Sequence, residues 1–171
     1  MRVLSMITAF VLGLSVGGAS AQGITDAQIA HIVVTANQVD IDAGKLAATM
    51  AASPEVKKFG ELMVTDHTGV NKSAVELATK LKVTPADNPT SQSLKAGGEK
   101  NLATLKGLKG SAFDRAYVDN EVAYHQAVLD AVDKTLIPGA TNAELKALLV
   151  KVRPAFVAHL EHAKKLQASL K

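Results

Sequence analysis

Hydrophobic residues recur at spacings of three and four along four long segments of this chain. That period places them on one face of a helix, whereas a strand would need strict alternation, and no stretch alternates convincingly. The predicted helices begin near Thr25-Asp26, Ser53, Ser111 and Thr141, and the first runs to about Ala52. Each helix therefore carries an apolar seam that must be buried against its neighbours.

Residues that favour helix ends support these limits. Ser53-Pro54-Glu55 places a cap, a proline at the first helical position and an acid in the first turn. Ser111 is expected to cap the third long helix, with Asp114 three residues later, and Thr141 with Glu144 forms a capping box for the last. Ile137-Pro138-Gly139 predicts the turn between these two helices, and Pro154 predicts a kink or a change of helix.

The pattern weakens between Thr90 and Gly110. Leu94, Leu102 and Leu105 suggest a short helix, but Gly97-Gly98 and Gly107 disfavour a long one. This segment is interpreted as a crossover between two antiparallel helical hairpins. The sequence thus predicts an all-α fold, a four-helix bundle of two hairpins with a crossover that contains a short extra helix.

Each apolar seam is interrupted once by a residue type that can bind metal, and the four interruptions are Asp40, His67, His125 and His159. An ionisable group on an inward seam costs free energy unless it is paired or coordinated. One interruption in every helix predicts a polar layer inside the bundle.

The positions of the turns indicate which of these residues meet. The midpoint of Asp40 and His67 falls on the Ser53-Pro54 turn, so the two are expected at one level, with Asp66 beside them. With a turn near Pro138, His159 is offset from His125 by roughly 10 Å along the helix axes. Glu121, one turn before His125, is the candidate link between the two levels.

Imidazole and carboxylate donors from facing helices suit a transition metal, here iron, zinc, manganese or copper, whereas calcium prefers more oxygen ligands. The candidate metal ligands are Asp40, Asp66, His67, Glu121, His125 and His159. The alternative is a buried hydrogen-bond network in which Asp40 bonds His67 and an acid such as Asp114 or Glu121 bonds a histidine. Such a network would only fix helix packing.

The start of the chain has the features of an export signal. Arg2 precedes an apolar run, and Ala19-Ser20-Ala21 supplies small residues for cleavage before Gln22. We expect residues 1–21 to be a signal peptide and residues 22–171 to form one helical domain in the periplasm or outside the cell. No later segment is apolar enough to span a membrane.

Composition narrows the function further. The chain has no cysteine, so a metal must be held by nitrogen and oxygen. A net charge of +3 without clustered basic residues gives no reason to expect nucleic-acid binding. No nucleophile motif or glycine-rich phosphate loop occurs, so no enzyme activity is predicted. A metal ion is the partner that the residues indicate, and they identify no protein partner.

Several further motifs follow one another along the chain: residues 39–47, Met63-Val64-Thr65-Asp66-His67, residues 113–118, His125, Arg153-Pro154 and His159-Leu160. Together they resemble a bacterial family, the domain of unknown function 4142, and the resemblance spans roughly Ile24 to Gln167. It implies an exported, ferritin-like helical bundle without an established reaction.

This chain departs from the pattern of ferritin-like metal sites. Asp40 stands where relatives usually carry glutamate, and Val64 and Phe156 stand where a glutamate would precede His67 and His159 by three residues. A standard di-iron oxidase is therefore not expected. The predicted function is metal handling or envelope stress protection through the core layer, and the alternative is a non-catalytic structural or interaction protein.

Overall fold

The protein's structure, a computed structural model, describes residues 23–170, and the predicted signal peptide and its cleavage site lie outside these residues. The described residues form helices and connecting loops, without a strand. The elements are α1 (Asp26–Met50), α2 (Pro54–Lys80), α3 (Pro89–Lys106), α4 (Gly110–Ala131), a π-helix η1 (Val132–Leu136), α5 (Ile137–Gly139) and α6 (Ala143–Ser169). The predicted all-α class is confirmed.

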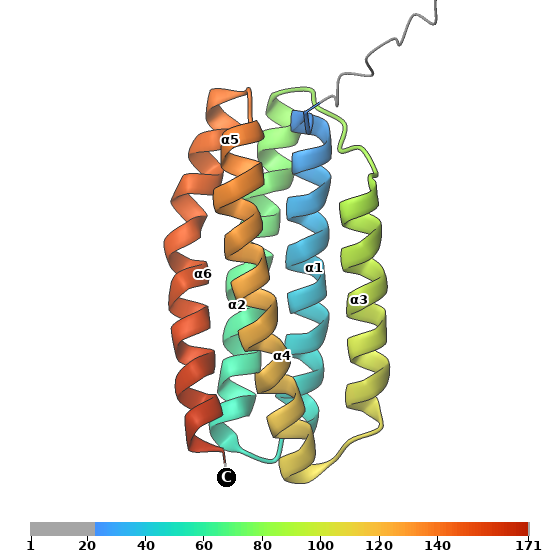
Figure 1. Cartoon of the computed structure of the whole chain (residues 1–171), viewed down its shortest axis with the longest axis vertical. Helices are drawn as coiled ribbons and strands as arrows, with labels where there is room; N and C mark the ends of the chain where they lie inside the picture. Colours follow the sequence, from blue (N-terminus) through green and yellow to red (C-terminus); the bar gives the residue numbers. More distant parts are fainter. Residues whose placement is uncertain (1–22, 171) are drawn as a thin grey trace, which may run out of the picture.

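The four long helices lie side by side as a bundle (Figure 1). α1 packs against α2 and α4, and α6 packs against the same two helices. α3 lies outside this group, on α1 and to a smaller extent on α4. No helix among residues 23–170 is long and apolar enough to cross a membrane.

The crossover contains a longer helix than the sequence predicted. α3 has 18 residues and includes both Gly97 and Gly98. Gly98 is buried because α3 approaches α1 closely there: a Cβ at this position would lie 2.8 Å from Cγ2 of Val39. Gly98 lowers the intrinsic helix propensity of this segment, but it allows α3 to pack closely on α1. Helix propensity does not include such a tertiary contact, so it underestimated the length of α3.

The first hairpin forms as predicted. Thr25 caps α1 in a reciprocal capping box with Gln28, and Ser53 caps α2 with Pro54 at the first helical position. α1 and α2 then cross closely, because Gly44 and Gly60 face each other. A Cβ on either glycine would lie 2.7 Å from the carbonyl oxygen of the other.

The predicted cap of the third long helix was wrong. α4 begins at Gly110, which has a φ of 59°, and Lys109 occupies the cap position without a side-chain hydrogen bond. Asp114 instead accepts hydrogen bonds from the backbone N–H groups of Ala52 (2.9 Å) and Ser53 (2.7 Å). A long-range interaction with the α1–α2 turn therefore replaces the expected local cap.

The second hairpin turns later than predicted. Ile137-Pro138-Gly139 do not form the turn: the helix continues from η1 into α5, which ends at Gly139, so the turn lies at residues 140–142. Asn142, rather than Thr141, caps α6, and the Thr141 backbone and side chain donate to Asp26 of α1. Pro154 lies inside one continuous helix, so the predicted change of helix does not occur.

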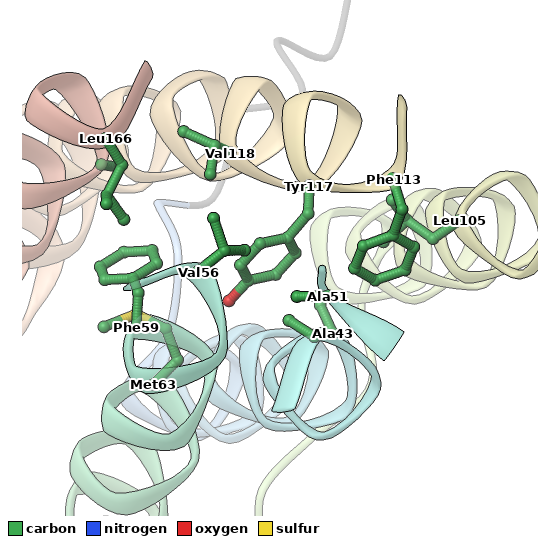
Figure 2. Close-up of a cluster of buried hydrophobic side chains, with 12 residues drawn as sticks. Ala43, Ala51, Val56, Phe59, Met63, Leu105, Phe113, Tyr117, Val118 and Leu166 are labelled. Atoms are coloured by element: carbon green, nitrogen blue, oxygen red, sulfur yellow. The ribbon is translucent and has the colours of Figure 1, made fainter. Parts of the chain in front are cut away.

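Two apolar clusters fill the ends of the bundle. The cluster near the α1–α2 turn includes Phe59, Phe113 and Tyr117, which reach inward from α2 and α4 (Figure 2). The cluster at the other end includes Ile29, Val33, Leu136 and Leu149, with contributions from α2. On each of the four long helices, the polar seam residues lie mainly between these clusters, in the middle of the bundle.

Candidate metal centre

The middle of the bundle contains five ionisable residues that are at most 3% exposed. They are Asp40 on α1, His67 on α2, Glu121 and His125 on α4, and His159 on α6. Their ion-pair distances within the described residues join histidines to carboxylates and involve no lysine or arginine. A buried group of this kind has to be neutral or bind a cation.

The three histidines converge although they come from three helices. Their ring centroids are 5.1 Å (His67–His159), 5.4 Å (His125–His159) and 5.6 Å (His67–His125) apart. One ring nitrogen from each can be chosen so that all three lie within 4.8 Å of one another. Phe156 stacks on His67 with a centroid distance of 5.5 Å and closes one side of the cluster.

A buried asparagine fixes the tautomer of His67. The side-chain amide of Asn37 donates to the carbonyl of Val33 at 2.7 Å, which leaves its Oδ1 as an acceptor facing His67. Nδ1 of His67 lies 2.6 Å from this oxygen and must therefore donate the hydrogen. In the neutral ring, the lone pair is then on Nε2.

The other two histidines are held in the same way. Nδ1 of His125 lies 3.1 Å from the backbone carbonyl of Glu121, which can only accept a hydrogen. Nε2 of His159 lies 2.9 Å from Oδ2 of Asp66, whose carboxylate likewise accepts. The lone pairs are therefore on Nε2 of His125 and Nδ1 of His159.

These three lone-pair nitrogens have no hydrogen-bond partner among the described residues. Burial is the main cause that lowers the pKa of His67 from 6.5 to about 2 and that of His125 to about 4, and neighbouring imidazoles lower them further. Burial also lowers the pKa of His159, against the effect of its bond to Asp66. The rings are thus neutral at pH 7, the form that binds metal.

Two carboxyl groups adjoin the histidines. Asp40, Glu121 and His125 form a second group whose candidate ligand atoms lie within 4.8 Å of one another. Burial, together with the neighbouring Glu121, holds the pKa of Asp40 well above 3.8, and burial raises the pKa of Glu121 to about 8. Both carboxyl oxygens of Glu121 lack a hydrogen-bond partner among the described residues. His125 belongs to both groups and joins them.

The donors in this layer fit a transition-metal ion. Ligating histidines in metalloproteins usually donate their second ring N–H to a carboxylate, a carbonyl or a similar acceptor, which orients the ring. All three histidines do so here, with acceptors on Asn37, Glu121 and Asp66. The unpartnered buried atoms are nitrogens and carboxyl oxygens, and imidazole with carboxylate suits copper, zinc, iron or manganese.

The structure brings five of the six candidate ligands into this layer. Asp40 and His67 meet as the turn position predicted, with Oδ2 of Asp40 3.4 Å from Nε2 of His67. The predicted offset of His125 from His159 was wrong, because the turn at residues 140–142 brings the two to one level. Asp66 lies behind His159, and its side chain is 39% exposed.

Asn37 was missed by the sequence analysis. It lies one helical turn before Asp40, and its buried amide holds His67 from the side opposite the cluster. A polar residue at i−3 from a seam carboxylate is the signal that would have identified it.

The comparisons with known proteins agree with this architecture. A solved structure of CopM in the Cu(II)-bound form superposes with a TM-score of 0.66, covers 86% of this chain and 100% of that chain, and is 17% identical in sequence. At this identity the likeness shows the fold alone. No curated protein matches the chain.

A family model matches residues 14–166, which is most of the chain. The motifs around His67, His125 and His159 and all of the helical bundle except the end of α6 lie within the matched range. The protein belongs to the family of the domain of unknown function DUF4142.

Proposed function

We propose that the protein binds a transition-metal ion, copper(II) by preference, in the middle of its bundle. His67, His125 and His159 supply three nitrogens, and Asp40 supplies an oxygen. One observation carries this proposal: three buried imidazoles from three helices lie with their ring centroids 5.1–5.6 Å apart. Each donates one ring N–H to the protein and has its other nitrogen without a hydrogen-bond partner among the described residues.

The spacing of the donors supports a single ion. Adjacent donors of a tetragonal copper(II) site, each about 2.0 Å from the ion, lie roughly 2.8 Å apart, and opposite donors lie roughly 4 Å apart. Oδ2 of Asp40 and Nε2 of His67 are 3.4 Å apart, and one ring nitrogen from each of the three histidines can be chosen so that all three lie within 4.8 Å of one another. A small inward movement of His125 and His159 would complete the site. The carboxyl group of Glu121 lies beside the outer nitrogen of His125, with Oε2 3.4 Å from Nδ1.

Copper is preferred on two grounds. Divalent copper binds nitrogen and oxygen sites more tightly than the other first-row ions. The structural neighbour CopM was solved in a Cu(II)-bound form, and its fold covers most of this chain. Together with the predicted signal peptide, this favours a role in metal handling outside the cytoplasm, with protection of the cell envelope as the benefit.

A second candidate is a buried network that only fixes helix packing. It is favoured by the three outer hydrogen bonds, which form without any ion. The raised pKa of both buried carboxyl groups also allows the layer to be neutral when empty. In this case the inward nitrogens bind no metal.

Metal loading separates the two candidates. Untagged protein would be stripped with chelator, loaded with copper, zinc, iron or manganese, desalted and analysed for metal. We expect one copper per chain, which falls at least tenfold in Asp40→Ala, His67→Ala and His125→Ala. His162→Ala, on the exposed face of α6, is the matched control and should retain its copper.

The outcomes are distinct. If the wild type retains no stoichiometric metal of any kind, the network is correct and the metal proposal fails. If the folded Asp40, His67 and His125 variants retain as much copper per chain as the wild type, the binding site lies elsewhere in the protein. Circular dichroism of each variant verifies that a loss of metal does not reflect unfolding.

A further inference from the structure

A cavity of about 130 Å³ lies inside the bundle next to the proposed metal site. Asn37, Asp40 and His67 line its inner end. Its remaining walls come mostly from aliphatic and aromatic side chains of α1, α4, η1 and α6, among them Ile32, Leu149 and Phe156. The cavity therefore joins an apolar space to the polar layer.

The cavity reaches towards the surface between α3 and α4. Thr90 and Leu94 of α3 line it on one side, and Ala127 and Ala131 of α4 on the other. Thr90 and Ala127 are exposed, whereas Asp40 and His67 at the inner end are buried. A small molecule that enters between these two helices would arrive at the Asp40–His67 edge of the metal site.

The walls determine what can occupy this space. A buried water needs two to four polar partners, and the surface that the cavity presents is apolar. The aliphatic and aromatic walls offer a hydrated cation no ligand to replace its water, so the space beyond Asp40 and His67 does not suit an ion. A dry apolar cavity of roughly 150 Å³ is large enough to bind benzene or xenon, so this cavity fits a molecule of up to about that size.

We propose that this cavity is a binding site for a small, neutral, apolar molecule, which lies with one end against His67 and Asp40. The proposal concerns a second ligand and does not rest on metal binding, because the cavity is formed by the protein alone. An apolar cavity of this kind is not needed to bind a metal ion, so it suggests a ligand of its own.

Benzene and xenon are suitable probes for purified, metal-free protein. Methyl resonances of Leu149 and Val152, which line the cavity, should shift on titration with either probe and reach saturation. Ala36→Leu places a larger side chain in the cavity and should weaken binding at least tenfold, as should Ala131→Leu. Ala123→Leu is the matched control, since Ala123 is exposed on α4 and does not line the cavity.

The proposal is overturned if neither probe shifts these methyl groups, or if both filling variants bind the probes as well as the wild type. Because Ala36→Leu and Ala131→Leu lie on different helices, the test can still be made if one of the two variants fails to fold. Because the experiment is performed without metal, its failure would leave the copper proposal unaffected. Equally, absent copper binding would not remove the cavity.

Discussion

Asn37 accepts a hydrogen bond from Nδ1 of His67 at 2.6 Å, across the crossing of α1 and α2. Its own amide group donates to Val33, so the orientation of the side chain is determined. Asp40, one turn later on α1, lies 3.4 Å from the other ring nitrogen of His67. One helix therefore contacts both nitrogens of a histidine on its neighbour, which fixes the direction of the lone pair.

Replacing Asn37 tests this orientation. Asn37→Ala removes the acceptor, so His67 can rotate or change tautomer, and copper affinity should fall about 10- to 100-fold, as is usual for the partner of a ligating histidine. A competition titration against a chelator of known affinity measures the change. The control is Gln38→Ala, at an exposed neighbouring residue whose side chain donates to Asp42, and this variant should bind copper like the wild type. Equal affinities of all three proteins would refute the role of Asn37.

Asp66 allows a ligand to be distinguished from a positioning residue. The side chain bonds the outer nitrogen of His159, so Asp66→Ala should lower copper affinity about 10- to 100-fold while one ion still binds. Metal analysis at saturating copper gives the stoichiometry, and the titration gives the affinity. Glu61→Ala, exposed on the same helix, is the control. Complete loss of copper at saturation would show instead that Asp66 is itself a ligand.

Much of this layer could be predicted from the sequence. The ionisable residues of the layer are recognisable because they occupy positions of the apolar pattern, where a hydrophobic residue is expected. The well-capped turn at Ser53 then puts Asp40 opposite His67. Asp66 was placed beside this pair but not behind His159, because a half-buried side chain can turn either way. Hydrophobic periodicity reports which face is buried, and it does not report the orientation of a polar group on that face.

The second hairpin shows why the remainder was not predictable. Pro138 and Gly139 are typical turn residues, yet the helix continues through them after the π-helical turn η1. Asp133 in η1 pairs with Arg153 of α6 through two hydrogen bonds of 2.6 and 2.7 Å, an interaction that local propensity cannot include. The turn at residues 140–142 then sets the register of His125 and His159.

Replacing a glycine of α1 or α2 by alanine should have opposite effects on stability inside and outside the crossing of these two helices. Gly44→Ala would place a Cβ 2.7 Å from the carbonyl oxygen of Gly60, so it should destabilise the fold by about 1–3 kcal/mol. Gly69→Ala, on the exposed side of α2 with no atom within 4 Å, should stabilise it by about 0.5–1 kcal/mol. Urea denaturation measures both, and a Gly44 variant as stable as the Gly69 variant would contradict the crossing.

The free energy of unfolding of the metal-free protein should pass through a broad maximum between about pH 4.5 and 6.5. The pKa of Glu121 is raised from 4.5 to about 8, so the folded state binds the extra proton and stability falls as pH rises towards 8. The pKa values of His67 and His125 are lowered from 6.5 to about 2 and 4, so the unfolded state binds the extra protons and stability falls as pH drops. Within the window, these two effects oppose each other.

Urea denaturation at pH 4, 5.5 and 8 tests this profile. Glu121→Gln should make the decline from pH 6.5 to 8 shallower, because the amide does not titrate. Greater stability of the wild type at pH 8 than at pH 5.5, without metal, would show that the buried carboxyl groups are not held protonated.

The central claim is that three specific histidines direct their lone pairs to one ion. It is tested most directly by electron paramagnetic resonance of protein loaded with one equivalent of copper(II). The spectrum should show couplings to three imidazole nitrogens, reduced to two in each of His67→Ala, His125→Ala and His159→Ala and unchanged in His162→Ala. A spectrum of free copper, or nitrogen couplings that none of these three substitutions alters, would contradict the account.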